Sequence, residues 1–175
     1  MKVLITGAGG FLGRKLAARL ATDGAMRIDG KPHALERLIL ADLVAPEASP
    51  ASFEVRSEAA DVTSSSAVAH LVGKGVDVVF HLAAIVSADA EANFDKGMSV
   101  NFDATRHLLQ ACRANGGARL LFASSVAVYG RTPGGVIRDD TWPQPQTSYG
   151  SQKIMGEVLV GDMSRKGFVD GRCVR

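Results

Sequence analysis

The chain of 175 residues carries 20 Lys and Arg against 18 Asp and Glu, for a net charge of +2, and is 46% hydrophobic and 22% charged. This composition is typical of one globular domain and excludes intrinsic disorder. The basic residues are scattered, which argues against a nucleic-acid partner, and no apolar run reaches the length of a membrane span.

The first predicted strand begins at Lys2 and leaves no room for a signal peptide, so we expect a cytoplasmic protein. Cys112 and Cys173 show no CxxC spacing, which favours reduced thiols in a reducing compartment. The histidines, at positions 33, 70, 81 and 107, show no metal-ligand spacing, and we expect no metal site.

In chain order, apolar runs rich in β-forming residues alternate with segments of helical periodicity. We predict strands near 2–6, 36–41, 53–57, 76–80, 118–123 and 168–174, and helices near 10–21, 64–73, 91–115 and 148–166. This alternation predicts one α/β domain over 1–175, with a doubly wound parallel sheet and helices on both faces. A ligand crevice is then expected at the carboxyl ends of the strands.

Two segments contain too many turn-forming residues for regular structure. The stretch 22–34, with its glycines and Pro32, is predicted to be a surface loop inserted before the second strand. The segment 129–147 holds a Gly-Gly pair and three prolines, with Pro133 and Gly134 among them. Composition alone does not decide whether this segment is a loop over a site or a plain linker.

The first strand runs into a glycine-rich turn, Gly7-Ala8-Gly9-Gly10-Phe11-Leu12-Gly13, which leads into a helix. Gly7 allows a tight reversal, Gly10 lets the main chain approach a pyrophosphate, and Gly13 allows close packing of helix on strand. Phe11 and Leu12 open the helix, whose free N–H groups face the anion. The spacing is GxxGxxG rather than GxGxxG, so the prediction of a dinucleotide site depends on residues further along the chain.

Asp42 follows the apolar run 38–41 at the end of the second strand. A carboxylate there can accept hydrogen bonds from an adenosine ribose and repels a 2′-phosphate, which favours NAD over NADP. Arg14, just past the glycine turn, could instead serve a phosphate. Without the glycine turn, Asp42 would read as a turn residue that ends a strand.

Candidate cofactor contacts also follow the third and fourth strands. Asp61-Val62 could meet the adenine, with the Asp61 carboxylate accepting a hydrogen bond from the adenine amine. In Leu82-Ala83-Ala84, the small side chains of the two alanines would let the backbone lie against the cofactor. Either pair could be plain turn chemistry. His81 is more often a packed histidine at a strand end than an acid or base, since no partner is visible.

The strongest pattern is Tyr149-Gly150-Ser151-Gln152-Lys153, preceded by Ser124-Ser125. A tyrosine and a lysine four positions apart lie on one helical face, one turn apart. A nearby ammonium stabilises the phenolate, so the tyrosine pKa is expected to fall from about 10 toward neutrality, which makes a usable base. A serine hydroxyl at the end of the fifth strand can polarise the same substrate oxygen. Taken alone, the Tyr-x-x-x-Lys spacing also occurs by chance on amphipathic helices.

Asn101 lies on the predicted helix 91–115. Facing inward, it could fix a water molecule or main chain near the lysine for a proton relay, whereas a surface position is also compatible with the pattern. The helices 91–115 and 148–166 could pair with their copies across a twofold axis, which would give a homodimer. The apolar stripes on these helices could equally serve packing within the chain.

Together these residues resemble the extended branch of the short-chain dehydrogenase/reductase superfamily, over essentially the whole chain. The glycine turn matches its cofactor loop, Tyr149 and Lys153 match its active-site pair, and the catalytic serine of its motif falls on Ser125. The resemblance implies a Rossmann-type NAD-binding domain in which Ser125, Tyr149 and Lys153 are catalytic.

A finer resemblance, to dehydrogenases of four-carbon sugar acids such as D-erythronate, lies in Phe94-Asp95-Lys96-Gly97-Met98, in 145–150 and in 164–172. It implies hydride transfer from the 2-hydroxyl carbon of a small-molecule sugar acid to NAD. Nucleotide-sugar 4-epimerases share the catalytic residues and are the first alternative. A non-catalytic dinucleotide sensor is the second, although it would have no need for a tuned proton acceptor.

Members of the extended branch continue well past the position of Arg175 with segments that build a substrate domain, which this sequence lacks. We therefore expect the 175 residues to be the NAD-binding part of a longer enzyme. On its own, this part is expected to bind NAD and to turn over substrate poorly or not at all.

Overall fold

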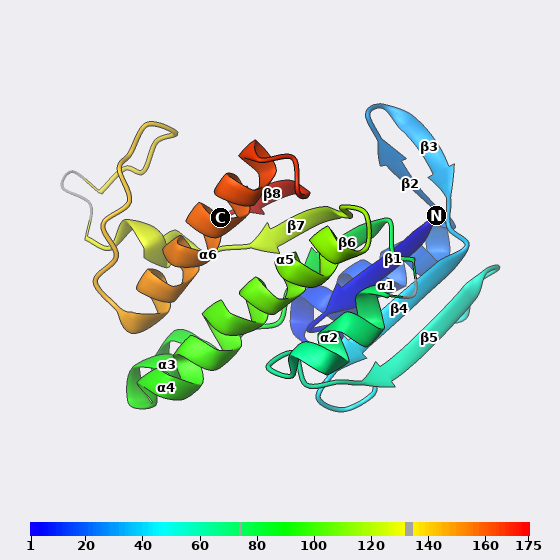
Figure 1. The fold of residues 1–175 in the computed structure, drawn as a ribbon, viewed down its shortest axis with the longest axis horizontal. Helices are drawn as coiled ribbons and strands as arrows, with labels where there is room; N and C mark the ends of the chain where they lie inside the picture. Colours follow the sequence, from blue (N-terminus) through cyan, green and yellow to red (C-terminus); the bar gives the residue numbers. More distant parts are fainter. Residues whose placement is uncertain (74, 132–134) are drawn as a thin grey trace.

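A computed structural model describes residues 1–73, 75–131 and 135–175 and contains a six-stranded sheet (Figure 1). Its strand order is β5-β4-β1-β6-β7-β8, and every neighbouring pair is parallel. The strands are β1 (Lys2–Thr6), β4 (Arg37–Asp42), β5 (Glu54–Ala59), β6 (Val78–His81), β7 (Arg119–Ala123) and β8 (Asp170–Val174). The six strands predicted from the apolar runs are thus confirmed.

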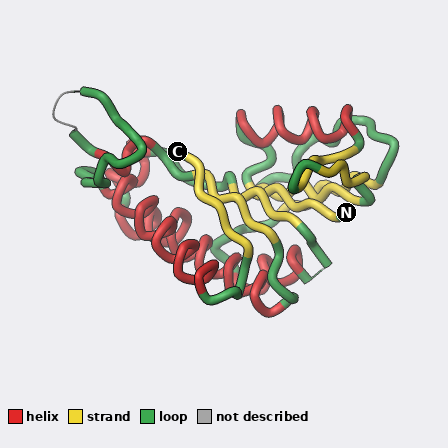
Figure 2. The backbone as a smooth tube through the Cα atoms, turned by 90° about the horizontal axis from the view of Figure 1, so that it is seen from above, coloured by secondary structure: helices red, strands yellow, loops and turns green. Residues whose placement is uncertain are grey.

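Helices cover both faces of the sheet, as Figure 2 shows, so the predicted doubly wound architecture is confirmed. On one face, α1 (Phe11–Asp23) packs its buried side chains on inward residues of β1 and β4. On the other face, a larger core joins the sheet to α2 (Ser65–Val72), α5 (Ala104–Ala114) and α6 (Ser148–Arg165). The central strands are buried from both sides, which explains their unbroken apolar runs.

The strands are added to the sheet first on one side of β1 and then on the other. The chain passes from β1 to β4 and β5 on one side, then crosses to β6, β7 and β8 on the other. Loops that leave β1 and β6 therefore diverge to opposite faces and leave a crevice between them at the carboxyl ends of the strands. This switch point is where the sequence predicts the cofactor loop.

The stretch 22–34 does not form the predicted surface loop. It forms an antiparallel hairpin of β2 (Ala25–Ile28) and β3 (Lys31–Ala34), which lies outside the main sheet. Asp29 and Gly30 connect the two strands with positive φ angles of 50° and 78°. An Asp-Gly pair is a strong signal for such a two-residue turn, and the sequence analysis overlooked it.

The predicted helix 91–115 is divided into several pieces. It comprises α3 (Ser87–Ala92), α4 (Phe94–Gly97), a π-helix η1 (Met98–Asp103) and then α5. The break falls at Asn93, whose backbone is extended and whose Oδ1 accepts a hydrogen bond from the N–H of Lys96 at 3.0 Å. The prediction of a single long helix was therefore wrong, because Asn93 caps a new helix instead of continuing the preceding one.

A short 3₁₀ helix, η2 (Val126–Tyr129), precedes the segment 129–147. The structure places no helix or strand over 130, 131 and 135–147, in agreement with the irregular structure that the prolines predict. Pro133 and Gly134 lie outside the described residues. Within the part of the chain that the structure describes, no helix is long and apolar enough to cross a membrane.

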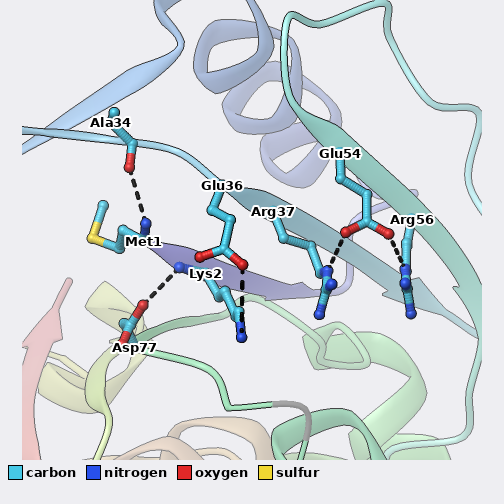
Figure 3. Close-up of polar contacts among 8 residues, drawn as sticks. All are labelled: Met1, Lys2, Ala34, Glu36, Arg37, Glu54, Arg56 and Asp77. Atoms are coloured by element: carbon cyan, nitrogen blue, oxygen red, sulfur yellow. Dashed lines mark hydrogen bonds and ion pairs between the residues drawn. The ribbon is translucent and has the colours of Figure 1, made fainter.

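Charged side chains join the amino-terminal ends of three neighbouring strands, at the edge opposite the crevice (Figure 3). Glu54 accepts from both Arg37 and Arg56 at 2.5 Å, and Lys2 lies 3.8 Å from Glu36. Ion pairs that are open to solvent, as these are, contribute little to stability. Their charges on β5 also discourage pairing of the edge strand with another chain.

Candidate active site

A cleft of about 560 Å³ lies where β1, β4, β5 and β6 end. Eight residues that the sequence analysis proposed for the cofactor line it, namely Gly7, Gly10, Asp42, Asp61, Val62, Leu82, Ala83 and Ala84. Gly9, Leu43, Val44, Ala60, Ile85, Lys96 and Val100 complete the lining. Most of these additional residues are sequence neighbours of the predicted ones, so the ends of the strands in the sequence indicate where the cleft lies.

The glycine turn is held closely against the strands around it. Gly7 has a φ of +73°, and a Cβ there would lie 2.6 Å from the backbone nitrogen of Ala83. At Gly13 a Cβ would lie 2.2 Å from the carbonyl oxygen of Gly7. Neither position admits a side chain, which matches the tight reversal and the close helix packing expected of these two glycines.

Asp42 binds the glycine turn directly. Its Oδ2 accepts a hydrogen bond from the N–H of Gly9 at 2.9 Å, and its Oδ1 accepts from the N–H of Leu43 at 2.8 Å. The carboxylate therefore orders the loop from the neighbouring strand and remains part of the cleft lining. The carboxylate that is predicted to bind the ribose is thus the same one that holds the glycine turn.

The remaining proposed cofactor residues lie in different surroundings. Asp61 lines the cleft, but its Oδ1 already accepts from the N–H and hydroxyl of Thr63, which is turn chemistry. Phe11 and Leu12 are 69% and 60% exposed at the start of α1 and do not line the cleft, whereas Gly13 is buried.

Lys153 and Tyr149 lie on α6, whose first turn is capped by the hydroxyl of Thr147. Lys153 is only 2% exposed, and its Nζ donates to the carbonyl oxygen of Ala123, at the end of β7, at 2.9 Å. The same Nζ lies 5.8 Å from the ring centroid of Tyr149. Burial lowers the pKa of Lys153 to about 8. The two side chains thus share one helical face, as their spacing predicts.

The two serines after β7 have different partners. Ser125 precedes η2, and its Oγ accepts from the N–H of Ala127 at 3.2 Å. Ser124 donates its hydroxyl to Glu157 of α6, and Glu157 also accepts from Nε of Arg175 at 2.9 Å. This contact ties the serine-bearing strand end to the helix that carries Lys153. No sequence motif predicts this contact, although Glu157 follows Lys153 by one helical turn.

Asn101 is 1% exposed, so the structure resolves its two possible placements in favour of the interior. It lies in the π-helix η1, and its amide forms hydrogen bonds with the backbone of Ile85 and the side chain of Gln152. Asn101 does not itself line the cleft, but it binds the backbone of Ile85, which does.

His81 is the packed strand-end histidine that the sequence analysis favoured. Its Nδ1 lies 2.7 Å from the hydroxyl of Thr6, and its Nε2 lies 3.0 Å from that of Thr105. Thr105 donates its own proton to the carbonyl oxygen of Asn101, so Nε2–H must donate to Thr105. Burial, together with the charge of Lys153, lowers the pKa of His81 to about 3.

This shift predicts an acid-dependent loss of stability. Below pH 6.5 the unfolded chain binds a proton at His81 that the folded chain does not bind, so stability falls as the pH falls toward 3. Between pH 6 and 5, His81→Gln should flatten the slope of unfolding free energy by about 1.4 kcal/mol per pH unit. Urea denaturation at each pH measures this slope, and His33→Gln, at an exposed histidine, is the control. Equal slopes for His81→Gln and wild type would contradict the assignment.

Within residues 1–73, 75–131 and 135–175, no three His, Cys, Asp or Glu side chains gather in a way that could hold a metal ion. Cys112 and Cys173 are both free thiols, and only Cys112 is buried. The candidate site residues are thus the lining of the cleft together with Tyr149 and Lys153 of α6 and Ser125 before η2.

Comparison with known proteins identifies the relatives of this arrangement. Residues 3–175 match the model of the NAD-dependent epimerase/dehydratase family. A D-erythronate dehydrogenase of Cupriavidus necator is 49% identical, over all of this chain and 54% of its own length. A nucleoside-diphosphate-sugar epimerase structure from Agrobacterium tumefaciens has a TM-score of 0.90 at 43% identity, over all of this chain and 52% of its own.

A UDP-glucose 4-epimerase of Thermus thermophilus, solved with NAD, has a TM-score of 0.83 at 26% identity, over all of this chain and 54% of its own. The chain thus spans about half the length of the curated relatives it matches. The match to the family model covers nearly every residue. The chain belongs to the NAD-dependent epimerase/dehydratase family.

Proposed function

We propose that the protein is an NAD-dependent dehydrogenase that oxidises a D-erythronate-like sugar acid at its 2-hydroxyl. The observation that carries the proposal is the buried ammonium of Lys153, 5.8 Å from the ring centroid of Tyr149. An ammonium beside a phenol stabilises the phenolate form, and a phenolate is the base that can accept the substrate's hydroxyl proton. The similarity to the Cupriavidus necator dehydrogenase supports the choice of a sugar acid.

The residues of the cleft fit a dinucleotide. Gly7, where any Cβ would strike the backbone of Ala83, allows the tight reversal into α1, and the first turn of α1 offers free N–H groups to a pyrophosphate. Asp42, at the neighbouring strand end, suits a ribose with free hydroxyls and disfavours a 2′-phosphate, hence NAD rather than NADP. When bound, NAD supplies the acceptor for the hydride.

In the proposed reaction the 2-hydroxyl proton of the sugar acid passes to Tyr149 as the hydride leaves carbon 2, which becomes a carbonyl. Lys153 holds positive charge beside Tyr149 and is anchored by the carbonyl oxygen of Ala123. Ser125, at the end of β7, steadies the oxygen of the developing carbonyl with its hydroxyl. Asn101 acts indirectly, through the backbone of Ile85.

The alternative is a nucleotide-sugar 4-epimerase, because the Thermus structure is that of a UDP-glucose 4-epimerase and the Agrobacterium structure is that of a nucleoside-diphosphate-sugar epimerase. An epimerase returns the hydride to the same carbon and produces no net NADH. The two functions are separated by assaying NADH release with four- to six-carbon aldonic acids, and inversion with UDP-sugars. Net reduction of NAD by D-erythronate supports the dehydrogenase, and inversion of a UDP-sugar without NADH release overturns it.

We also propose that the whole protein forms a homodimer through α6 and the π-helix η1. Beside the face that packs on the sheet, α6 carries a second apolar face, which lines a groove of about 480 Å³. Its residues are Phe102, Ile154, Met155, Val158, Leu159 and Asp162. A helix that is apolar on two sides calls for a second partner, and the matching face of a second copy would cover this one.

Val158 is 67% exposed at the centre of this face, so Val158→Asp should leave the monomer folded and prevent dimer formation. Sedimentation equilibrium at micromolar concentration measures this outcome. Val136→Asp places the same charge at a valine that is 62% exposed in the segment 129–147, and should leave the dimer intact. A monomeric wild type, or a Val158→Asp dimer of unchanged affinity, would refute the proposed interface.

A further inference from the structure

Gln152 is a completely buried residue of α6. In the sequence it lies between the proposed proton acceptor Tyr149 and Lys153. Its Oε1 accepts a hydrogen bond from Nδ2 of Asn101 at 2.8 Å, across 51 positions of the sequence. Its Nε2 has no hydrogen-bond partner among the described residues. A buried polar group that is only half satisfied calls for an explanation.

The neighbouring hydrogen bonds determine the orientation of both amides. The N–H of Ile85 donates to Oδ1 of Asn101 at 2.9 Å, so the other side of Asn101 must be its NH₂ group. That NH₂ group donates to the carbonyl oxygen of Ile85 at 3.3 Å and to Gln152. Gln152 must therefore present its oxygen to Asn101, because the reverse orientation would bring two NH₂ groups together.

The remaining NH₂ group of Gln152 lies against Gly97. A Cβ at position 97 would lie 2.5 Å from Nε2 and 3.0 Å from Oε1. Gly97 directly precedes the π-helix η1 that carries Asn101. The absence of a side chain at Gly97 thus gives the amide of Gln152 the space to reach Asn101.

Protein stability does not account for a glutamine at this position. An unsatisfied buried donor costs about 1–3 kcal/mol, and an apolar side chain of the same length would avoid that cost. Without Gln152, Asn101 would keep both of its bonds to Ile85 and lose the acceptor of one amide N–H, so one unsatisfied donor would replace another and the glutamine brings no net gain in stability. What the glutamine adds is a continuous connection from α6, which carries Tyr149 and Lys153, to Ile85 in the lining of the cleft.

We propose that Gln152 is a positioning residue for hydride transfer. It acts through Asn101 to hold the Ile85 segment of the cleft at a fixed distance from Tyr149 and Lys153. The proposal rests on the proposed function, because it assigns the cleft to NAD and the tyrosine to proton transfer. It predicts that replacement of the amide impairs the catalytic geometry and leaves the stability nearly unchanged.

The test is Gln152→Met in the whole protein, with NAD affinity from titration calorimetry and kcat from NADH formation. Loss of one positioning hydrogen bond should raise the Kd for NAD about fivefold and lower kcat about tenfold, while the thermal midpoint stays nearly the same. In an Asn101→Ala background, Gln152→Met should add no further loss. Gln110→Met, at an exposed glutamine of α5, is the control and should change none of these quantities.

Unchanged Kd and kcat in Gln152→Met would overturn the proposal. Additive losses in the double variant would also overturn it, because they would show that Gln152 does not act through Asn101. A thermal midpoint that falls by several degrees together with kcat would show a structural role instead. If the wild type itself neither binds NAD nor forms NADH, the proposed function fails, and that outcome is distinct from a failure confined to Gln152.

Discussion

Tyr149→Phe is expected to lower kcat by about a thousandfold while the Kd for NAD changes by less than about twofold. The substitution removes only the oxygen that takes the substrate proton, and it keeps the ring that packs beside Lys153. Tyr149 is absent from the cleft lining at the glycine turn, so cofactor binding there should persist. Initial rates of NADH formation and calorimetric titration with NAD measure the two quantities.

The second tyrosine of the chain provides a matched control. Tyr129 is buried, and its hydroxyl accepts a hydrogen bond from Arg175 instead of facing Lys153. Tyr129→Phe should cost some stability and leave kcat within about threefold of wild type. A Tyr149→Phe variant that retains wild-type turnover would remove Tyr149 as the proton acceptor.

Lys153→Met is expected to lower turnover by at least about a hundredfold and yet to stabilise the folded protein without NAD. Burial lowers the pKa of Lys153 from its ordinary value of 10.5 to about 8. At pH 7 the folded chain therefore carries the cost of a desolvated ammonium. Its removal should raise the free energy of unfolding by about 2–3 kcal/mol. Chemical denaturation and NADH assays measure the two effects.

The same shift gives this stabilisation a defined pH dependence. Between pH 8 and 10.5 the unfolded chain binds more protons at Lys153 than the folded chain, so wild-type stability rises through this window. The advantage of Lys153→Met should therefore be constant below pH 8 and disappear above pH 10.5. Lys166→Met, at an exposed lysine just after α6, should change neither stability nor turnover. Destabilisation by Lys153→Met at pH 7 would contradict a buried, desolvated ammonium.

The sheet could be predicted from the sequence because buried parallel strands leave continuous apolar runs. The details that were missed depend on contacts outside the local pattern. The hairpin at 22–34 was hidden by a loop-like composition, although Asp29 and Gly30 carried the turn signal. The apolar stripe of 91–115 begins only at Phe94, and periodicity alone does not show that Asn93 caps the helix that starts there.

The site shows the same division between local and long-range information. The glycine turn and the spacing of Tyr149 and Lys153 are short motifs, and the structure places them as those motifs predict. The roles of Gln152 and Glu157 depend on partners on other elements, Asn101 of η1 and Ser124 after β7, which sequence spacing does not bring together. Such residues become visible only when the fold is known.

The most direct measurement uses D-erythronate that carries deuterium at carbon 2, incubated with the whole protein and NAD. If Tyr149 takes the hydroxyl proton while the hydride leaves carbon 2, the NADH formed contains that deuterium and the oxidation is slower than with unlabelled substrate. Unlabelled NADH, or no net NADH while a UDP-sugar is inverted, would contradict the assignment of this cleft to sugar-acid oxidation.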